Sequence, residues 1–244
     1  MLYRTPRYVV TLDTDWVPAF VLDYVLSLLA SFNLPATVFC TSPYALENIP
    51  GITPALHPNL MADSSQGSSQ TETINNLKHL YPGAWGVRTH RLFWHSSLYD
   101  LFAEHGLRYD SSVFMPLQAY LVPNSHLGLT RFPIWWTDAF HVLSGFDLSR
   151  FVPPGRDEPG LKVLLFHPIH VYCNSRQPRS TSRRLVDLDL FHCSEQDLAG
   201  FRNPGQGMES LFLNALHWLS AHRDQLSSLP ALLPDAVAPH VCVS

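Results

Sequence analysis

The chain of 244 residues has only four cysteines, almost no lysine and no long apolar segment. Cys40, Cys173, Cys193 and Cys242 form no CxxC pair and have no regular spacing, which argues against a disulfide framework and against a cysteine zinc site. We therefore expect reduced, mostly buried thiols. No stretch of about 18 consecutive apolar residues is present, so no membrane span is expected.

The chain also lacks a block of basic residues, and its formal net charge is −4. Composition therefore gives no indication of nucleic-acid binding. No apolar segment of signal-peptide length precedes the first expected strand, which predicts a cytoplasmic protein. The length suits a single domain spanning residues 1–244, and nothing in the sequence indicates an oligomeric state.

Expected strands and helices alternate along most of the chain. The run "RYVVTLD" at 7–13 is typical of a buried strand, and an apolar stripe at helical spacing follows at 18–32. Another buried strand at 34–42 completes a β-α-β unit, which implies parallel strands. Further strands are expected at 53–57, 83–93, 107–114, 129–138 and 161–172, and further helices at 71–81, 96–106 and 207–226.

Two details of this pattern are also predicted. Pro133 indicates an edge or a bulge within its strand, and Thr71 is a candidate cap of its helix. The stretch 174–204 is polar and irregular, so a long surface loop is expected there. A Pro-rich tail follows the last helix, 207–226.

The alternation favours an α/β barrel or a doubly wound sheet, and in both the sites form at the carboxyl ends of the strands. Four expected strands end in polar residues of the types that bind metal ions or transfer protons. These residues are Asp13, Asp15, His57, Arg88, His90, His167 and His170. In a parallel barrel they share one rim, built from residues 9–172, and that rim is the predicted site.

Carboxylates together with imidazoles suit Zn²⁺ or a similar divalent ion, which keeps an open position for water in catalytic sites. One aspartate of the pair Asp13 and Asp15 can bind the metal while the other acts as a base. Their i, i+2 spacing on a strand would point both to one face. The alternative is that the two aspartates cap the helix that begins near "VPAF".

Several short segments in sequence order resemble one family. They are "TLDTDW", "LHPN", "GVRTHRLF", "YDSS", "FPIWW" and "LLFHPIHVY", which span most of 9–172, and "GFRNPGQG" before the last helix. The chain resembles polysaccharide deacetylases of carbohydrate esterase family 4, the NodB-homology type, and looks closest to the WbmS-like branch. The resemblance implies a distorted (β/α) barrel with about seven parallel strands. It also implies metal-dependent removal of an acetyl or similar acyl group from an amino sugar or sugar of a surface polysaccharide or its precursor.

The resemblance implies roles for the first two motifs. Asp13 matches the base and Asp15 the metal ligand, although Thr14 separates them where the family usually has adjacent aspartates. His57 matches the first histidine of the second motif. The second histidine would lie four residues later, where Met61 stands, and a thioether cannot replace imidazole for zinc. We take His90 as the substitute ligand, and zinc as the expected metal, with nickel, cobalt and manganese as alternatives.

The remaining roles also follow from the resemblance. Arg88 matches the arginine that orients the base, and His167 matches the histidine that protonates the leaving amine. His170 is the alternative proton donor. The expected substrate-binding residues are Trp16, Asn59, Trp135 and Trp136, the last two as walls of a sugar pocket.

Other functions stay open at this point. "DTDWV" at 13–17 fits the DxDx[TV] pattern of haloacid-dehalogenase-type phosphatases, but these need a downstream lysine and an acidic pair after a strand. "RDE" at 156–158 is expected in a loop, and the histidines would stay unexplained. The histidine missing at Met61 motivates a non-catalytic carbohydrate-binding protein on the same fold. A different amidohydrolysis on a small or nucleotide-linked substrate would suit the same rim.

Overall fold

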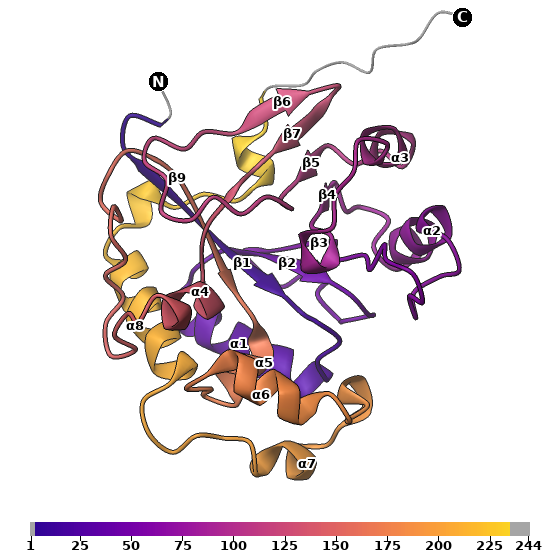
Figure 1. The fold of residues 1–244 in the computed structure, drawn as a ribbon. Helices are drawn as coiled ribbons and strands as arrows, with labels where there is room; N and C mark the ends of the chain where they lie inside the picture. The colour runs from indigo at the N-terminus through magenta and orange to yellow at the C-terminus, as the bar shows by residue number, and fades with distance from the viewer. Residues whose placement is uncertain (1–2, 235–244) are drawn as a thin grey trace, which may run out of the picture.

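A curled sheet forms the centre of the molecule, as the computed structural model of residues 3–234 shows (Figure 1). Its nine strands lie in the order β6-β7-β5-β4-β3-β2-β1-β9-β8. The strands within the described residues are β1 (Pro6–Asp13), β2 (Ala36–Cys40), β3 (Ile52–Leu56), β4 (Gly86–Val87), β5 (Tyr109–Asp110), β6 (Asn124–His126), β7 (Leu129–Arg131), β8 (Ile134–Thr137) and β9 (Gly160–Phe166).

The two ends of the parallel sheet are joined through one chain segment. β7 pairs with β5 and β8 pairs with β9, both in parallel, and only Phe132 and Pro133 separate β7 from β8. Every other pairing is also parallel except that of β6 with β7. Nine strands without β6, and with β7 and β8 counted as one, leave seven. The predicted distorted barrel of about seven parallel strands is therefore confirmed.

The prediction for Pro133 is confirmed as a bulge. The register between β8 and β9 shifts between Ile134 and Trp136, directly after this proline. A proline cannot donate a backbone hydrogen bond, so it is tolerated where the ladder is interrupted. At this bulge the chain passes from β7, which pairs with β5, to β8, which pairs with β9.

Helices cover the outside of the sheet. They are α1 (Ala19–Ser31), α2 (Gln70–Leu80), α3 (Leu98–Glu104), α4 (Asp138–Leu143), α5 (Pro168–Tyr172), α6 (Pro178–Leu185), α7 (Glu195–Ala199) and α8 (Met208–Ser220). The apolar stripe of α8 has no exposed surface, and its residues are Leu211, Phe212, Ala215, Leu216 and Leu219. The predicted cap of α2 is wrong by two residues, because Ser69 accepts the hydrogen bond from the Glu72 amide.

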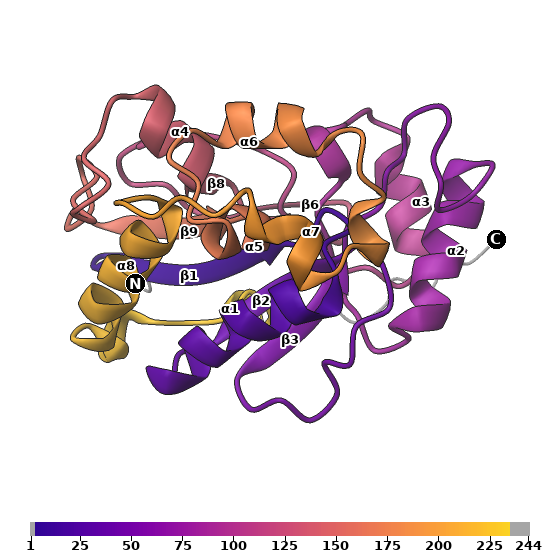
Figure 2. The same cartoon turned by 90° about the horizontal axis from the view of Figure 1, so that it is seen from below.

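The expectation of an irregular loop at 174–204 is also wrong, because α6 and α7 lie within it. Both helices are short and mostly polar, so the sequence contains no long apolar stripe from which they could be predicted. Pro178 begins α6, and Thr181 and Leu185 are its buried positions. In Figures 1 and 2 this orange segment lies at the end of the barrel toward which the β1 arrow points.

The cysteines agree with the predicted free thiols as far as they are described. Cys40 and Cys173 are buried, Cys193 is partly exposed, and none of the three is in a disulfide. Cys242 lies outside the described residues. No helix between residues 3 and 234 is both long enough and apolar enough to cross a membrane.

Candidate metal centre

The polar residues that follow the parallel strands meet at one edge of the barrel. Asp13 is the last residue of β1, His57 follows β3, Arg88 follows β4 and His167 follows β9. The carboxyl ends of parallel strands lie at the same edge, so these side chains converge although they are far apart in sequence.

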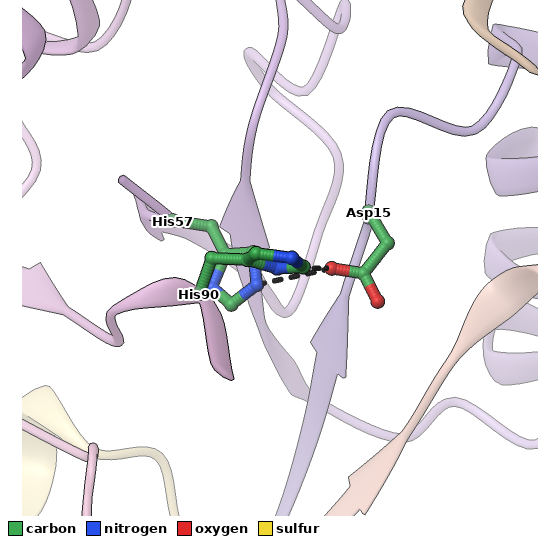
Figure 3. A group of neighbouring side chains, drawn as sticks. All are labelled: Asp15, His57 and His90. Carbon is green, nitrogen blue, oxygen red and sulfur yellow. Dashed lines mark hydrogen bonds and ion pairs between the residues drawn. The ribbon is translucent and has the colours of Figure 1, made fainter. Parts of the chain in front are cut away.

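Asp15, His57 and His90 form a group that could hold a metal ion (Figure 3). Their ligand atoms all lie within 4.8 Å of one another. Both imidazole rings face the same carboxylate oxygen: Asp15 Oδ1 is 3.2 Å from His57 Nε2 and 3.1 Å from His90 Nδ1. One carboxylate and two imidazoles are the donor set of several catalytic zinc sites.

The hydrogen bonding of His57 fits a metal ligand. Its Nδ1 lies 2.6 Å from the carbonyl oxygen of Arg88, which can only accept a hydrogen bond. Nδ1 therefore carries the proton, and Nε2 points toward Asp15. A backbone carbonyl behind a ligating histidine is a common way to fix the tautomer and the ring orientation. Because Nε2 and the carboxylate oxygen each present a lone pair, a proton or a metal cation must lie between them.

The ionisation of this group follows from its contacts. Burial raises the pKa of Asp15, but hydrogen bonds from His57 and His90 and the charge of His167 hold this pKa well below its ordinary value. Burial lowers the pKa of His57, but the Asp13 charge and the Asp15 hydrogen bond raise it more. The result is an anionic carboxylate that favours the protonated form of His57, and a bound metal would displace that proton.

A left-handed turn places Asp15, and this corrects the expected geometry. β1 ends at Asp13, so Asp15 is not on the strand and strand alternation does not aim it. Asp15 and Trp16 instead have φ values of 44° and 58°. Such angles are uncommon in residues with a Cβ and are concentrated at functional sites. The Trp16 amide donates to Thr41 Oγ1 at 2.8 Å, which holds the turn in place.

A second left-handed turn places His90. Arg91 and Leu92 have φ values of 56° and 55°, and the His90 amide donates to the Pro58 carbonyl at 2.8 Å. This bond ties the segment after β4 to the segment after β3. His90 therefore lies beside His57, with their ring centroids 5.5 Å apart.

Arg88 lies where the resemblance places it, against Asp13. Arg88 Nη1 is 2.7 Å from Asp13 Oδ1, and the arginine has no exposed surface. The guanidinium also donates to Thr11 and Ser111 and stacks over the Phe39 ring. These contacts fix one oxygen of Asp13, whereas the other lies 3.9 Å from His57 Nε2 and faces the metal group.

His167 lies near the other oxygen of Asp15 and is held by Asp138, a residue that was not among the predicted site residues. Asp138 Oδ1 is 2.8 Å from His167 Nδ1, and Oδ2 accepts the His167 amide at 2.7 Å. His167 Nε2 points to the site, 3.8 Å from Asp15 Oδ2. Burial lowers the pKa of His167, but Asp138, Asp15 and Asp13 raise it to about 10. Asp138 directly follows β8, so the rule of polar strand ends would have found it.

His170 is placed differently from its neighbour. Its Nδ1 lies 3.3 Å from Ser175 Oγ and its Nε2 lies 3.4 Å from Ser182 Oγ. Burial, the largest influence, lowers the pKa of His170 to about 4. The ring is therefore neutral near pH 7, and both its nitrogens are turned to serines.

Of the four expected substrate-binding residues, two are buried in the core and two lie near the candidate site or line a cavity. Trp135 and Trp136 have no exposed surface, so the expectation that they wall a pocket is wrong; the β8 bulge leaves both rings in the core. Trp16 is partly exposed and lies edge-on to His90, with ring centroids 5.0 Å apart. Asn59 Oδ1 accepts from the Met61 amide, and both residues line a cavity of about 430 Å³.

Fold and site together define a parallel barrel that gathers, at the carboxyl ends of its strands, a group that could hold a metal ion, a buried aspartate–arginine pair and a histidine–aspartate pair. The chain belongs to the WbmS-like polysaccharide deacetylase family, whose model matches residues 10–183. No curated protein sequence matches the chain.

Solved structures include similar proteins. One is WbmS of Bordetella bronchiseptica, a candidate polysaccharide deacetylase involved in O-antigen biosynthesis. It is 27% identical, has a TM-score of 0.77, and the match covers 87% of this chain and 90% of that one. Another is a family 4 carbohydrate esterase of Streptomyces lividans, solved with acetate. It is 15% identical with a TM-score of 0.41, and the match covers 91% of each chain.

Proposed function

We propose that this protein is a metal-dependent hydrolase that removes an acetyl or similar acyl group from an amino sugar or sugar of a surface polysaccharide or its precursor. The observation that carries the proposal is the arrangement of the Asp13–Arg88 and His167–Asp138 pairs around the metal group. Membership of the deacetylase family supports the reaction class. The proposed compartment is the cytoplasm, with which the three described free cysteines agree.

The donor set favours zinc, with nickel, cobalt and manganese as alternatives. Asp15, His57 and His90 would supply three protein ligands and leave a position open to water and substrate. When bound, the cation polarises the acyl carbonyl and lowers the pKa of a water molecule.

The protein's own residues then move the protons. Asp13 takes a proton from the attacking water through the oxygen that Arg88 leaves unbound. A bond forms between the water oxygen and the acyl carbon, and the carbon–nitrogen bond breaks. His167 Nε2 gives its proton to the leaving nitrogen, while Asp138 holds the ring and favours its protonated form.

Metal removal tests the proposed reaction. We expect the purified protein to release acetate from N-acetylated saccharides, and we expect chelation to lower the rate by about a hundredfold or more because no charged electrophile would remain at the carbonyl. Zinc should restore the rate. Release of acetate that is insensitive to chelation would contradict the proposal. Stoichiometric metal without any acetate release would favour the non-catalytic alternative. Magnesium-dependent hydrolysis of p-nitrophenyl phosphate would favour the phosphatase.

Asp138→Asn tests the role of His167 through the pH profile. The carboxylate raises the pKa of His167, so its loss should lower that pKa. The protonated ring would then be lost at a lower pH, and the alkaline limb of kcat/KM should move toward neutrality. We expect kcat near pH 7 to fall by about 10²- to 10⁴-fold.

The matched control is Asp147→Asn, an exposed aspartate in the loop after α4 whose carboxylate bonds to Ser149. It should leave both limbs of the profile unchanged. An alkaline limb that does not move in Asp138→Asn would show that His167 is not the proton donor.

A further inference from the structure

The segment leading into and through α6 carries a local excess of positive charge. Four of the sixteen basic residues lie within nine positions that contain no acidic residue, and these are Arg176, Arg179, Arg183 and Arg184. The net charge of the whole chain, −4, conceals this excess, so the expectation that no basic block exists is too coarse.

α6 lies next to the candidate site. Ser182 on this helix has its Oγ 3.4 Å from His170 Nε2. The ring of His170 is 5.7 Å from the ring of His167, whose Nε2 is 3.8 Å from Asp15 Oδ2. Two side chains therefore separate α6 from the metal group. Figures 1 and 2 show the helix at the same end of the barrel as the carboxyl end of β1.

The arginines do not share one side of the helix. Pro178, Thr181 and Leu185 are its buried positions. With about 3.6 residues per turn, Arg179 and Arg183 lie on the side of the exposed surface that also carries Ser182. Arg184 lies on the other flank, where its guanidinium stacks 4.7 Å from the Phe201 ring.

Arg179 and Arg183 have no partner among the residues that the structure describes. Both are exposed, and neither forms an ion pair or a side-chain hydrogen bond with any residue between 3 and 234. Like charges four residues apart on a helix repel each other, and a positive charge in the first turn opposes the helix dipole. The dipole favours Arg183, which lies in the last turn, but not Arg179, so helix stability does not account for the two charges together, whereas a negatively charged ligand beside the site would.

We propose that Arg179 and Arg183 bind an anionic oxyacid group, a phosphate or a carboxylate, on the saccharide that the site acts on. The proposal rests on the proposed function, because it assumes that a saccharide occupies the neighbouring metal group. Guanidinium groups match the planar geometry of carboxylate and phosphate oxygens and form charge-assisted bonds to them. The substrate is then a charged sugar, either nucleotide-linked or part of an acidic glycan, rather than a neutral one.

Calorimetric titration of the metal-loaded protein tests the proposal with three probes. UDP-N-acetylglucosamine supplies phosphate, a hyaluronan tetrasaccharide supplies carboxylate, and tri-N-acetylchitotriose is neutral. In R179Q/R183Q we expect the Kd of one anionic probe to rise about tenfold, because two charge-assisted contacts are lost. The neutral probe should be unaffected, and the anionic probe that responds identifies the group.

The control is R4Q/R184Q, which removes the same charge from exposed positions at the amino end of β1 and on the other flank of α6. It should bind all three probes as the unaltered protein does. Equal weakening in both double variants, or no anion preference in the unaltered protein, would overturn the proposal. Acetate release is measured separately, so anion-selective binding without acetate release would count against the deacetylase function alone. The melting temperature of R179Q/R183Q should change little, since the loss of the repulsion offsets the loss of a last-turn charge that the helix dipole favours.

Discussion

Asp13→Asn should lower kcat for acetate release by about 10²- to 10⁴-fold, the contribution usual for a positioned base. It should leave close to one equivalent of bound metal. The asparagine keeps the shape of the side chain and can still accept the Arg88 hydrogen bond, but it cannot take a proton from water. The measurements are steady-state acetate release and the metal content of the purified variant.

The pairing of two readouts is what makes this variant informative. Asp13 lies 3.9 Å from His57 through its second oxygen, so the alternative is that it binds the metal itself. Loss of metal from Asp13→Asn would show that it is a ligand and that the roles of Asp13 and Asp15 are reversed. Asp23→Asn, an exposed aspartate on α1, is the matched control and should change neither readout.

His90→Ala should weaken zinc binding by at least about a hundredfold, beyond the usual effect of an outer-sphere partner. We expect this loss of affinity because, without His90, only one imidazole and one carboxylate of the group remain to bind the metal. Competition with a chromophoric chelator gives the affinity directly. The rate of acetate release should fall with it and should recover in part at high zinc concentration.

Two comparisons separate this result from a general loss of structure. His79→Ala removes an exposed histidine at the end of α2 and should leave zinc affinity unchanged. Met61→Ala should also leave it unchanged, because a thioether is a poor zinc ligand. If Met61→Ala and His90→Ala weakened binding equally, the third ligand would not be His90.

The barrel and the rim could be predicted because both depend on local patterns. Buried parallel strands give uninterrupted apolar runs, and their carboxyl ends share one edge whatever the sequence separation. Asp13, His57, Arg88 and His167 therefore converge as expected. The same rule applied to the end of β8 would have added Asp138.

What the sequence did not predict depends on contacts across the chain. Trp135 and Trp136 suit a sugar pocket by residue type, but a bulge in β8 leaves both in the core. The short helices α6 and α7 bury only a few residues each, so their periodicity is too weak to recognise. The left-handed turns at Trp16 and Leu92 involve residues that seldom adopt positive φ angles, so residue preferences do not predict these turns.

The turn after Asp13 bears on how related sequences can be recognised. Thr14 separates the two aspartates, and with the left-handed angles of Asp15 and Trp16 both carboxylates still lie within 3.9 Å of His57 Nε2. The backbone thus accommodates the extra residue. The second left-handed turn places His90 beside His57, where we propose that it substitutes for the histidine expected at position 61. A search pattern that demands adjacent aspartates and paired histidines would overlook proteins built this way. A pattern of DxD, one histidine and RxH would retrieve them.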